Sequence, residues 1–99
     1  MNHITIKFTP GMEARIAAGL KTATTCDEKK GEIGDTFTVL GGTYMILDIV
    51  DLSLMTVRDH FYRAEGFTSP KKFETFWRSM FGGFPEMKPH YIHFFARLP

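Results

Sequence analysis

Lys21 and Thr24 lie three residues apart in a short polar segment that follows Gly19. A lysine donates hydrogen bonds as a cation and acts as a base when it is desolvated. A threonine hydroxyl is a weak nucleophile that needs such a base beside it. The two side chains face the same way only if the chain bends between them, and Gly19 is typical of a helix end that permits such a bend. The pair predicts a nucleophilic or ligand-binding site; a solvated turn is the alternative.

Glu65 is a second candidate because of where it stands. It immediately precedes Gly66, at the expected end of a helix. A carboxylate there opposes the negative end of the helix dipole, which costs a few tenths of a kcal/mol. A local rule broken in this way can mark a functional residue. An exposed acid on a frayed last turn is the alternative.

The only cysteine, Cys26, and the four histidines, His3, His60, His90 and His93, are candidates for thiol or metal chemistry. No histidine lies near Cys26 in the sequence, so an inert thiol is the prediction. The spacing of His90 and His93 puts them on opposite faces of a strand. No pair of residues has the spacing of a zinc site. We therefore expect neither a metal nor a cofactor.

Composition is consistent with one domain spanning residues 1–99. Hydrophobic residues make up 43% of the chain, and a single cysteine allows no internal disulfide. We expect a cytoplasmic protein with no membrane segment, since we find no signal peptide and no long apolar run. The formal net charge of +1 argues against a strongly basic nucleic-acid binder. The first 52 residues carry a net charge of −2 and the remainder +3.

The first half of the chain has the pattern of strands around one helix. His3–Phe8 alternates polar and apolar residues, as a half-buried strand does. Thr9 and a following proline predict the start of a helix that ends near Gly19. Residues 36–40 and 44–50 are expected to form a hairpin, joined by a turn at Gly41-Gly42.

The second half predicts two helices and a last strand. Ser53 is a suitable N-cap for a helix over residues 54–64, and Ser69 with a following proline opens another. The apolar stripe of this second helix comprises Phe73, Phe76, Trp77 and Met80. Residues 90–98 are expected to form a strand. This order of elements fits a small α+β barrel or an α+β sandwich.

Four segments together resemble the ASCH domain, a relative of the PUA RNA-binding barrel. They are the Lys21-x-x-Thr24 motif and residues 30–37, 64–73 and 91–95. Cys26 departs from the family, which usually has arginine at this position. The resemblance implies an α+β fold: a PUA-like small mixed β-barrel with covering helices.

The same resemblance implies three alternative functions. The first is a binding module for RNA or a modified nucleoside, with a cleft around Lys21, Thr24 and Glu65. The second is an amidohydrolase acting on N4-acetylcytidine, in which Lys21 takes the proton of Thr24, Thr24 attacks the acetyl group, and Glu65 transfers a proton to the leaving amine. The third is a domain without an active cleft that binds a protein partner. The further ligand-binding candidates are Thr25, Cys26, Tyr44, Phe67 and Arg58.

Overall fold

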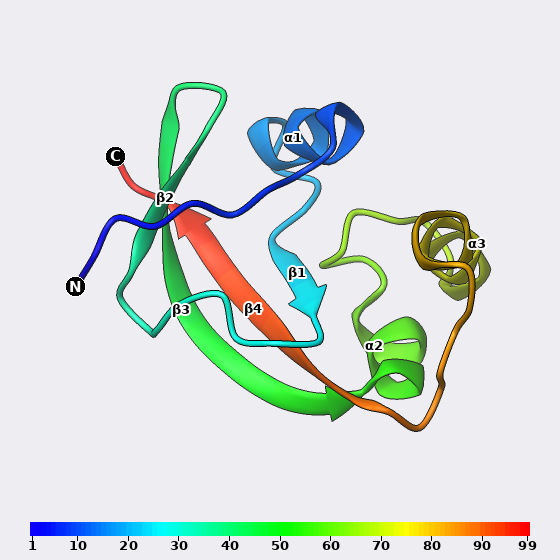
Figure 1. The fold of residues 1–99 in the computed structure, drawn as a ribbon. Helices are drawn as coiled ribbons and strands as arrows, with labels where there is room; N and C mark the ends of the chain where they lie inside the picture. The colour runs from blue at the N-terminus through cyan, green and yellow to red at the C-terminus, as the bar shows by residue number, and fades with distance from the viewer.

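A curled four-stranded antiparallel sheet forms the centre of the domain (Figure 1). The computed structural model describes residues 1–99. The strands are β1 (Ala23–Cys26), β2 (Thr36–Val39), β3 (Gly42–Ser53) and β4 (Pro89–Arg97), in the spatial order β1-β4-β3-β2. All three pairings are antiparallel, and no pairing joins β1 to β2. The sheet is thus an open half-barrel. The α+β class is confirmed, and the expected barrel is present as a half-barrel with antiparallel strand pairs. The isolated parallel bridge of His3 with Thr36 lies outside these strands.

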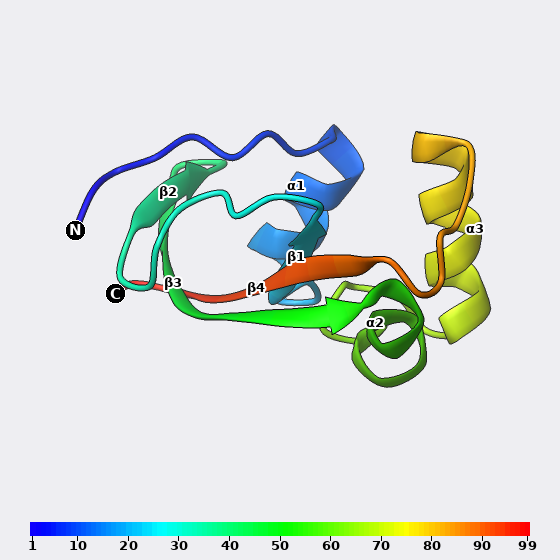
Figure 2. The same cartoon turned by 60° about the horizontal axis from the view of Figure 1, so that its bottom comes forward.

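The predicted hairpin between β2 and β3 is present. Its two-residue loop places Leu40 at φ 46° and Gly41 at φ 80°, as a tight turn with two left-handed residues requires. β3 is longer than predicted and carries a bulge between Ile46 and Asp48. Because a bulge bends its strand and increases its twist, it lets β3 curve around the sheet (Figure 2).

The strand expected over His3–Phe8 is wrong. Only His3 forms a bridge, with Thr36, and Ile4 N–H donates to the Thr36 carbonyl at 2.7 Å. β2 is only four residues long, and the segment then leaves it to reach the first helix. The alternation still identified the inward face, because Ile4, Ile6 and Phe8 pack against the core.

Three helices complete the fold: α1 (Pro10–Ala17), α2 (Leu54–Phe61) and α3 (Pro70–Phe81). Each N-cap was predicted, and in each the hydroxyl accepts an N–H from three residues on; the caps are Thr9, Ser53 and Ser69. α2 is shorter than expected, since it ends at Phe61 and turns lead on to Gly66. No helix is both long enough and apolar enough to cross a bilayer.

The core has two parts, one at each end of the sheet. α1 and the N-terminal segment cover one part, while α2 and α3 gather where β3 ends and β4 begins (Figure 1). Phe73 and Trp77 of α3 are buried as predicted. Met80, which was placed on the same stripe, is 44% exposed. The last turn of α3 therefore presents apolar side chains beyond the core.

Candidate functional site

Lys21 and Glu65 meet in the interior, although they are 44 residues apart in the sequence. Lys21 Nζ lies 3.0 Å from Glu65 Oε1 and 3.4 Å from the Glu65 backbone carbonyl. The two residues are 2% and 3% exposed. Their convergence was predicted; their complete burial was not.

Backbone hydrogen bonds bring this pair together. The N–H groups of Thr22 and Ala23, at the start of β1, both donate to the Ala64 carbonyl, at 2.8 and 3.0 Å. Gly66 follows Glu65 with φ 95°, a left-handed conformation that favours glycine. A Cβ on Gly66 would lie 3.1 Å from Lys21 Cβ. The turn after α2 can therefore lie directly against the Lys21 backbone.

The hydroxyl that joins this pair belongs to Thr25. Thr25 Oγ1 donates to Glu65 Oε2 at 2.7 Å. Thr24 was the predicted partner, but it forms no side-chain hydrogen bond with Lys21 or Glu65. Its side chain lines a hollow beside the N-terminal segment, which Thr25 lines as well. Neighbouring residues of a strand point to opposite faces, so only one of the two threonines can face Glu65.

The geometry is that of an ammonium paired with a carboxylate. Lys21 donates to both Glu65 oxygens it approaches, and an ammonium has no lone pair with which to accept a proton. Of Lys21, Glu65 and Thr25, only Thr25 lines the cleft of about 330 Å³ at the end of β1. Lys21 borders a smaller hollow of about 120 Å³. In this arrangement Lys21 orients Glu65 rather than serving as a free base.

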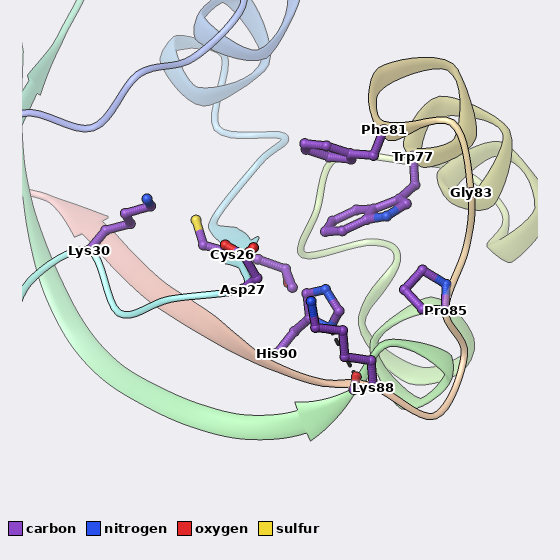
Figure 3. A pocket seen from close by; sticks show the side chains of 10 residues that line it. Cys26, Asp27, Lys30, Trp77, Phe81, Gly83, Pro85, Lys88 and His90 are labelled. Atoms are coloured by element: carbon purple, nitrogen blue, oxygen red, sulfur yellow. Dashed lines mark hydrogen bonds between the residues drawn. The ribbon is translucent and has the colours of Figure 1, made fainter.

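A cleft of about 330 Å³ opens between the end of β1 and the C-terminal half of α3 (Figure 3). Its lining comprises Thr25, Cys26, Asp27, Lys30, Trp77, Phe81, Gly83, Pro85, Lys88 and His90. The Trp77 and Phe81 rings form one wall with centroids 4.6 Å apart, and Lys30 lies across the opening from them. Phe81 is 61% exposed. The cleft thus combines an accessible aromatic surface with two lysines.

Two of the lining residues, His90 and Asp27, supply hydrogen-bond acceptors. His90 Nδ1 lies 2.9 Å from the Lys88 carbonyl, which can only accept, so in a neutral ring Nδ1 carries the proton and Nε2 is left as an acceptor. The exposed Asp27 carboxylate lies at the same end of β1. These two groups suit a ligand that presents N–H donors.

Cys26 lies in the cleft wall as an unreactive thiol. Burial raises the pKa of Cys26 from 9.0 to about 11. Since the thiolate is the nucleophilic form, this thiol remains protonated near neutral pH. Its contribution to the cleft is an uncharged wall.

His93 lies beneath the cleft and is completely buried. The Lys30 N–H donates to Nε2 at 3.0 Å, so Nδ1 carries the proton and donates to the Thr24 carbonyl at 3.2 Å. Burial lowers the pKa of His93 below its ordinary value of 6.5. The neutral ring therefore ties the loop that carries Lys30 to the sheet.

Three further predicted ligand-binding residues lie away from this cleft. Tyr44 is buried and its hydroxyl donates to the Ile16 carbonyl at 3.4 Å. Arg58 is held by the carboxylates of three acidic residues: Asp59, Glu74 and Glu86. Phe67 lines a different hollow, beside the first half of α3.

The sequence reasoning missed most of the cleft lining, notably Lys30, Phe81, Lys88 and His90. One signal was available for Phe81. It follows the last apolar stripe position of α3 and precedes a glycine pair, so an exposed aromatic at the helix end was readable from the pattern.

No three His, Cys, Asp or Glu side chains gather in a way that would hold a metal ion.

No family sequence model matches the chain, and no curated protein matches it significantly. The solved structures that share its fold include the following two. One is an ASCH domain from Lactobacillus crispatus JV V101, with 14% identity and a TM-score of 0.75 over 97% of this chain and 77% of that one. The other is a DUF984 protein from Enterococcus faecalis V583, with 16% identity and a TM-score of 0.64 over 89% and 67% of the respective chains. The chain has the fold of an ASCH domain.

Proposed function

We propose that this domain binds a nucleoside, free or within RNA, in the cleft between β1 and α3. The observation that carries the proposal is the aromatic wall of Trp77 and Phe81 facing Lys30 across a hollow of about 330 Å³. That volume lies at the lower end of the range typical of small-molecule sites. Stacking of a base on an aromatic ring contributes about 1–3 kcal/mol.

The polar groups favour a base with an exocyclic amine. Asp27 and the free nitrogen of His90 accept hydrogen bonds, and carboxylates pair well with the amine of cytosine. Lys30 and Lys88 supply positive charge for the phosphate of a nucleotide. The cleft therefore suits a cytidine- or adenosine-type nucleotide.

Trp77 provides a direct test because it is the only tryptophan in the chain. Cytidine 5′-monophosphate is titrated into the protein while Trp77 fluorescence is recorded, and saturable quenching is expected. Phe81→Ala should weaken binding roughly tenfold through the loss of stacking. Lys30→Ala should also weaken it, while Lys29→Ala, which removes the adjacent exposed lysine, should not.

A result against this proposal is equally clear. If neither fluorescence nor backbone amide NMR shifts respond to millimolar cytidine 5′-monophosphate or adenosine 5′-monophosphate, the cleft does not bind nucleosides. Shifts confined to residues outside the cleft lead to the same conclusion.

One observation favours an amidohydrolase as a second candidate. The Thr25 hydroxyl lines the cleft and donates to a carboxylate that Lys21 holds in place. With N4-acetylcytidine as substrate, the Thr25 oxygen would form a bond to the carbonyl carbon of the acetyl group. The proton of the Thr25 hydroxyl would pass to Glu65. That proton would move to the exocyclic nitrogen as the C–N bond breaks, and water would then cleave the acetyl ester.

The second candidate is tested by incubating the protein with N4-acetylcytidine and measuring the cytidine formed by chromatography. Thr25→Val should abolish turnover if Thr25 is the nucleophile, whereas Thr24→Val should abolish it if the residue predicted from the sequence acts instead. Circular dichroism controls for folding. Absence of turnover by the wild-type protein removes the enzyme and leaves the binding proposal intact.

A further inference from the structure

The nucleoside cleft continues into a longer groove along α3. A hollow of about 590 Å³ adjoins it and shares four of its lining residues: Thr25, Cys26, Lys30 and Phe81. Its other walls are the N-terminal segment, Met12 of α1 and Met80 of α3. Phe81 therefore stands between the two hollows, with its ring exposed to both.

A third hollow, of about 560 Å³, lies beside the first half of α3. Arg15 of α1 packs over the Phe67 ring, with its Cζ atom 4.8 Å from the ring centroid. The Phe67 and Phe76 ring centroids are 5.1 Å apart, and Phe76 belongs to α3, so this hollow also spans α1 and α3. Arg15 is one turn beyond Met12 on α1, and Phe76 is one turn before Met80 on α3. The third hollow shares no lining residue with the other two. Its α3 residues run from Lys71 to Ser79, whereas those of the other two run from Trp77 to Phe81. We call the three hollows together the α3 groove.

Charge in the α3 groove is strongly one-sided. Six of the 12 lysines and arginines line it, against one of the 11 acidic residues, Asp27. The six cations are Lys7, Arg15, Lys30, Lys71, Lys72 and Lys88. None of them forms a salt bridge, whereas the cations outside the groove on α2 and α3, Arg58 and Arg78, are paired with carboxylates. In a chain of net charge +1, this concentration leaves a surface complementary to a polyanion.

The cations are distributed along the groove instead of being gathered at one point. Lys71 and Lys72 begin α3, whereas Lys30 and Lys88 lie near its other end. A helix of 12 residues is about 18 Å long, more than one phosphate group spans. Two exposed apolar side chains, Met80 and Phe81, lie in the last turn of α3, at the end where Lys30 lies. A positively charged groove combined with stacking surfaces is typical of single-strand binding.

We infer that the α3 groove binds a single-stranded polynucleotide, with one base in the cleft and the flanking phosphates on the lysines and arginine along α3. This inference rests on the proposed function, since the cleft supplies the base contact. It adds a backbone contact that a free nucleoside would not use. Lys71 and Lys72 in the first turn of α3 are disfavoured by the helix dipole, and a phosphate beside them would offset that cost.

Binding of a fluorescein-labelled cytidine decanucleotide, measured by anisotropy between 50 and 200 mM salt, tests the inference. Six phosphate contacts predict a slope of log K against log salt of about −4, because each contact contributes roughly −0.7 on single strands. The Lys71→Ala/Lys72→Ala variant should make the slope shallower by about 1.4 for the same reason. The Lys29→Ala/Arg63→Ala variant removes the same charge from exposed positions outside the groove and should retain the wild-type slope.

Three outcomes overturn the inference. If the decanucleotide binds no more tightly than cytidine 5′-monophosphate, the proposed function stands and the groove has no role. If the two double variants lose equal slope, only net charge matters. If polyglutamate competes as well as RNA while Phe81→Ala has no effect, the groove is a site for acidic peptides. If the wild-type protein binds the decanucleotide but not cytidine 5′-monophosphate, the result counts against the proposed function and not against the groove.

Discussion

The buried Lys21–Glu65 pair has a structural role that can be separated from any role in catalysis. Two charges removed from water are stable here because they face each other and because Thr25 donates to the remaining carboxylate oxygen. Removing one partner would leave the other charge buried and uncompensated. Thr25, which touches both this pair and the cleft, is the residue through which the pair can influence a ligand.

Replacement of Glu65 by glutamine should therefore destabilise the fold by about 3–5 kcal/mol, because the Lys21 ammonium loses its counter-charge. Urea unfolding measures the change. Lys21→Met combined with Glu65→Gln should recover much of the loss, since no charge is then stranded. Glu28→Gln, at an exposed acid, is the control and should stay within about 0.5 kcal/mol. A Glu65→Gln cost as small as the control's would contradict this account.

His93 should make stability depend on pH. Its pKa is lowered in the folded state, so below about pH 6.5 the unfolded chain binds the proton more readily, and stability falls as pH falls. The slope can reach about 1.4 kcal/mol per pH unit until the folded pKa is passed. Protonation also removes the acceptor of the Lys30 N–H. The negative charge of Glu65 raises the pKa of His93 and so opposes this shift, whereas the positive charge of Lys30 lowers the pKa further.

Unfolding free energies measured from pH 7.5 to 5 check this expectation. His93→Gln should remove the slope in this range, even though it lowers stability overall. His60→Gln, at an exposed histidine, should leave the slope unchanged. An identical slope in the His93 variant would show that another group is responsible.

At the scale of elements, the site depends on how the turn after α2 meets the start of β1. Two N–H groups of the strand share the Ala64 carbonyl, and Gly66 allows the backbones to approach. The helix starts were readable from the sequence because a cap is a local hydrogen bond between neighbouring residues. The end of α2 was not, since the turns from Tyr62 to Gly66 are held by contacts with β1.

Gly66→Ala should cost more than an ordinary glycine substitution. A left-handed φ of 95° disfavours any Cβ by about 1–2 kcal/mol. The new methyl would also lie 3.1 Å from Lys21 Cβ and 3.2 Å from Arg15 Cδ, adding about 1–3 kcal/mol of overpacking. Gly19→Ala isolates the first effect, because φ is 79° there and no atom lies within 4 Å. Equal losses in thermal unfolding would argue against close packing at Gly66.

In the whole molecule, positively charged side chains from both halves of the chain are brought together in the α3 groove. Lys7, Arg15 and Lys30 come from the first half of the chain, which is acidic overall, yet they join three lysines of the second half. The acids of the first half lie elsewhere, apart from Asp27. The net charge argues only against a strongly basic nucleic-acid binder, and the placement of the charges is the basis of the single-strand binding proposed above.

Binding along the α3 groove should stabilise the folded protein. At a free oligonucleotide concentration one hundred times the Kd, the expected gain is about 2.7 kcal/mol. For a domain of this size that corresponds to a rise in Tm of roughly 10 °C or more. Differential scanning calorimetry with the cytidine decanucleotide measures the shift. A Tm unchanged by saturating oligonucleotide would be incompatible with binding to the native state.

Four features were predictable from the order of amino acids: the helix starts, the hairpin, most of the inward-facing residues, and the approach of Lys21 to Glu65. The first three follow from local hydrogen bonds, turn conformations and periodic burial; the last came through a family resemblance. Three features became visible only in the folded chain: the sheet stays open, Thr25 rather than Thr24 meets Glu65, and Phe81 and six cations line the α3 groove. These features depend on strand register and on packing between distant segments, which side-chain spacing along the chain does not encode.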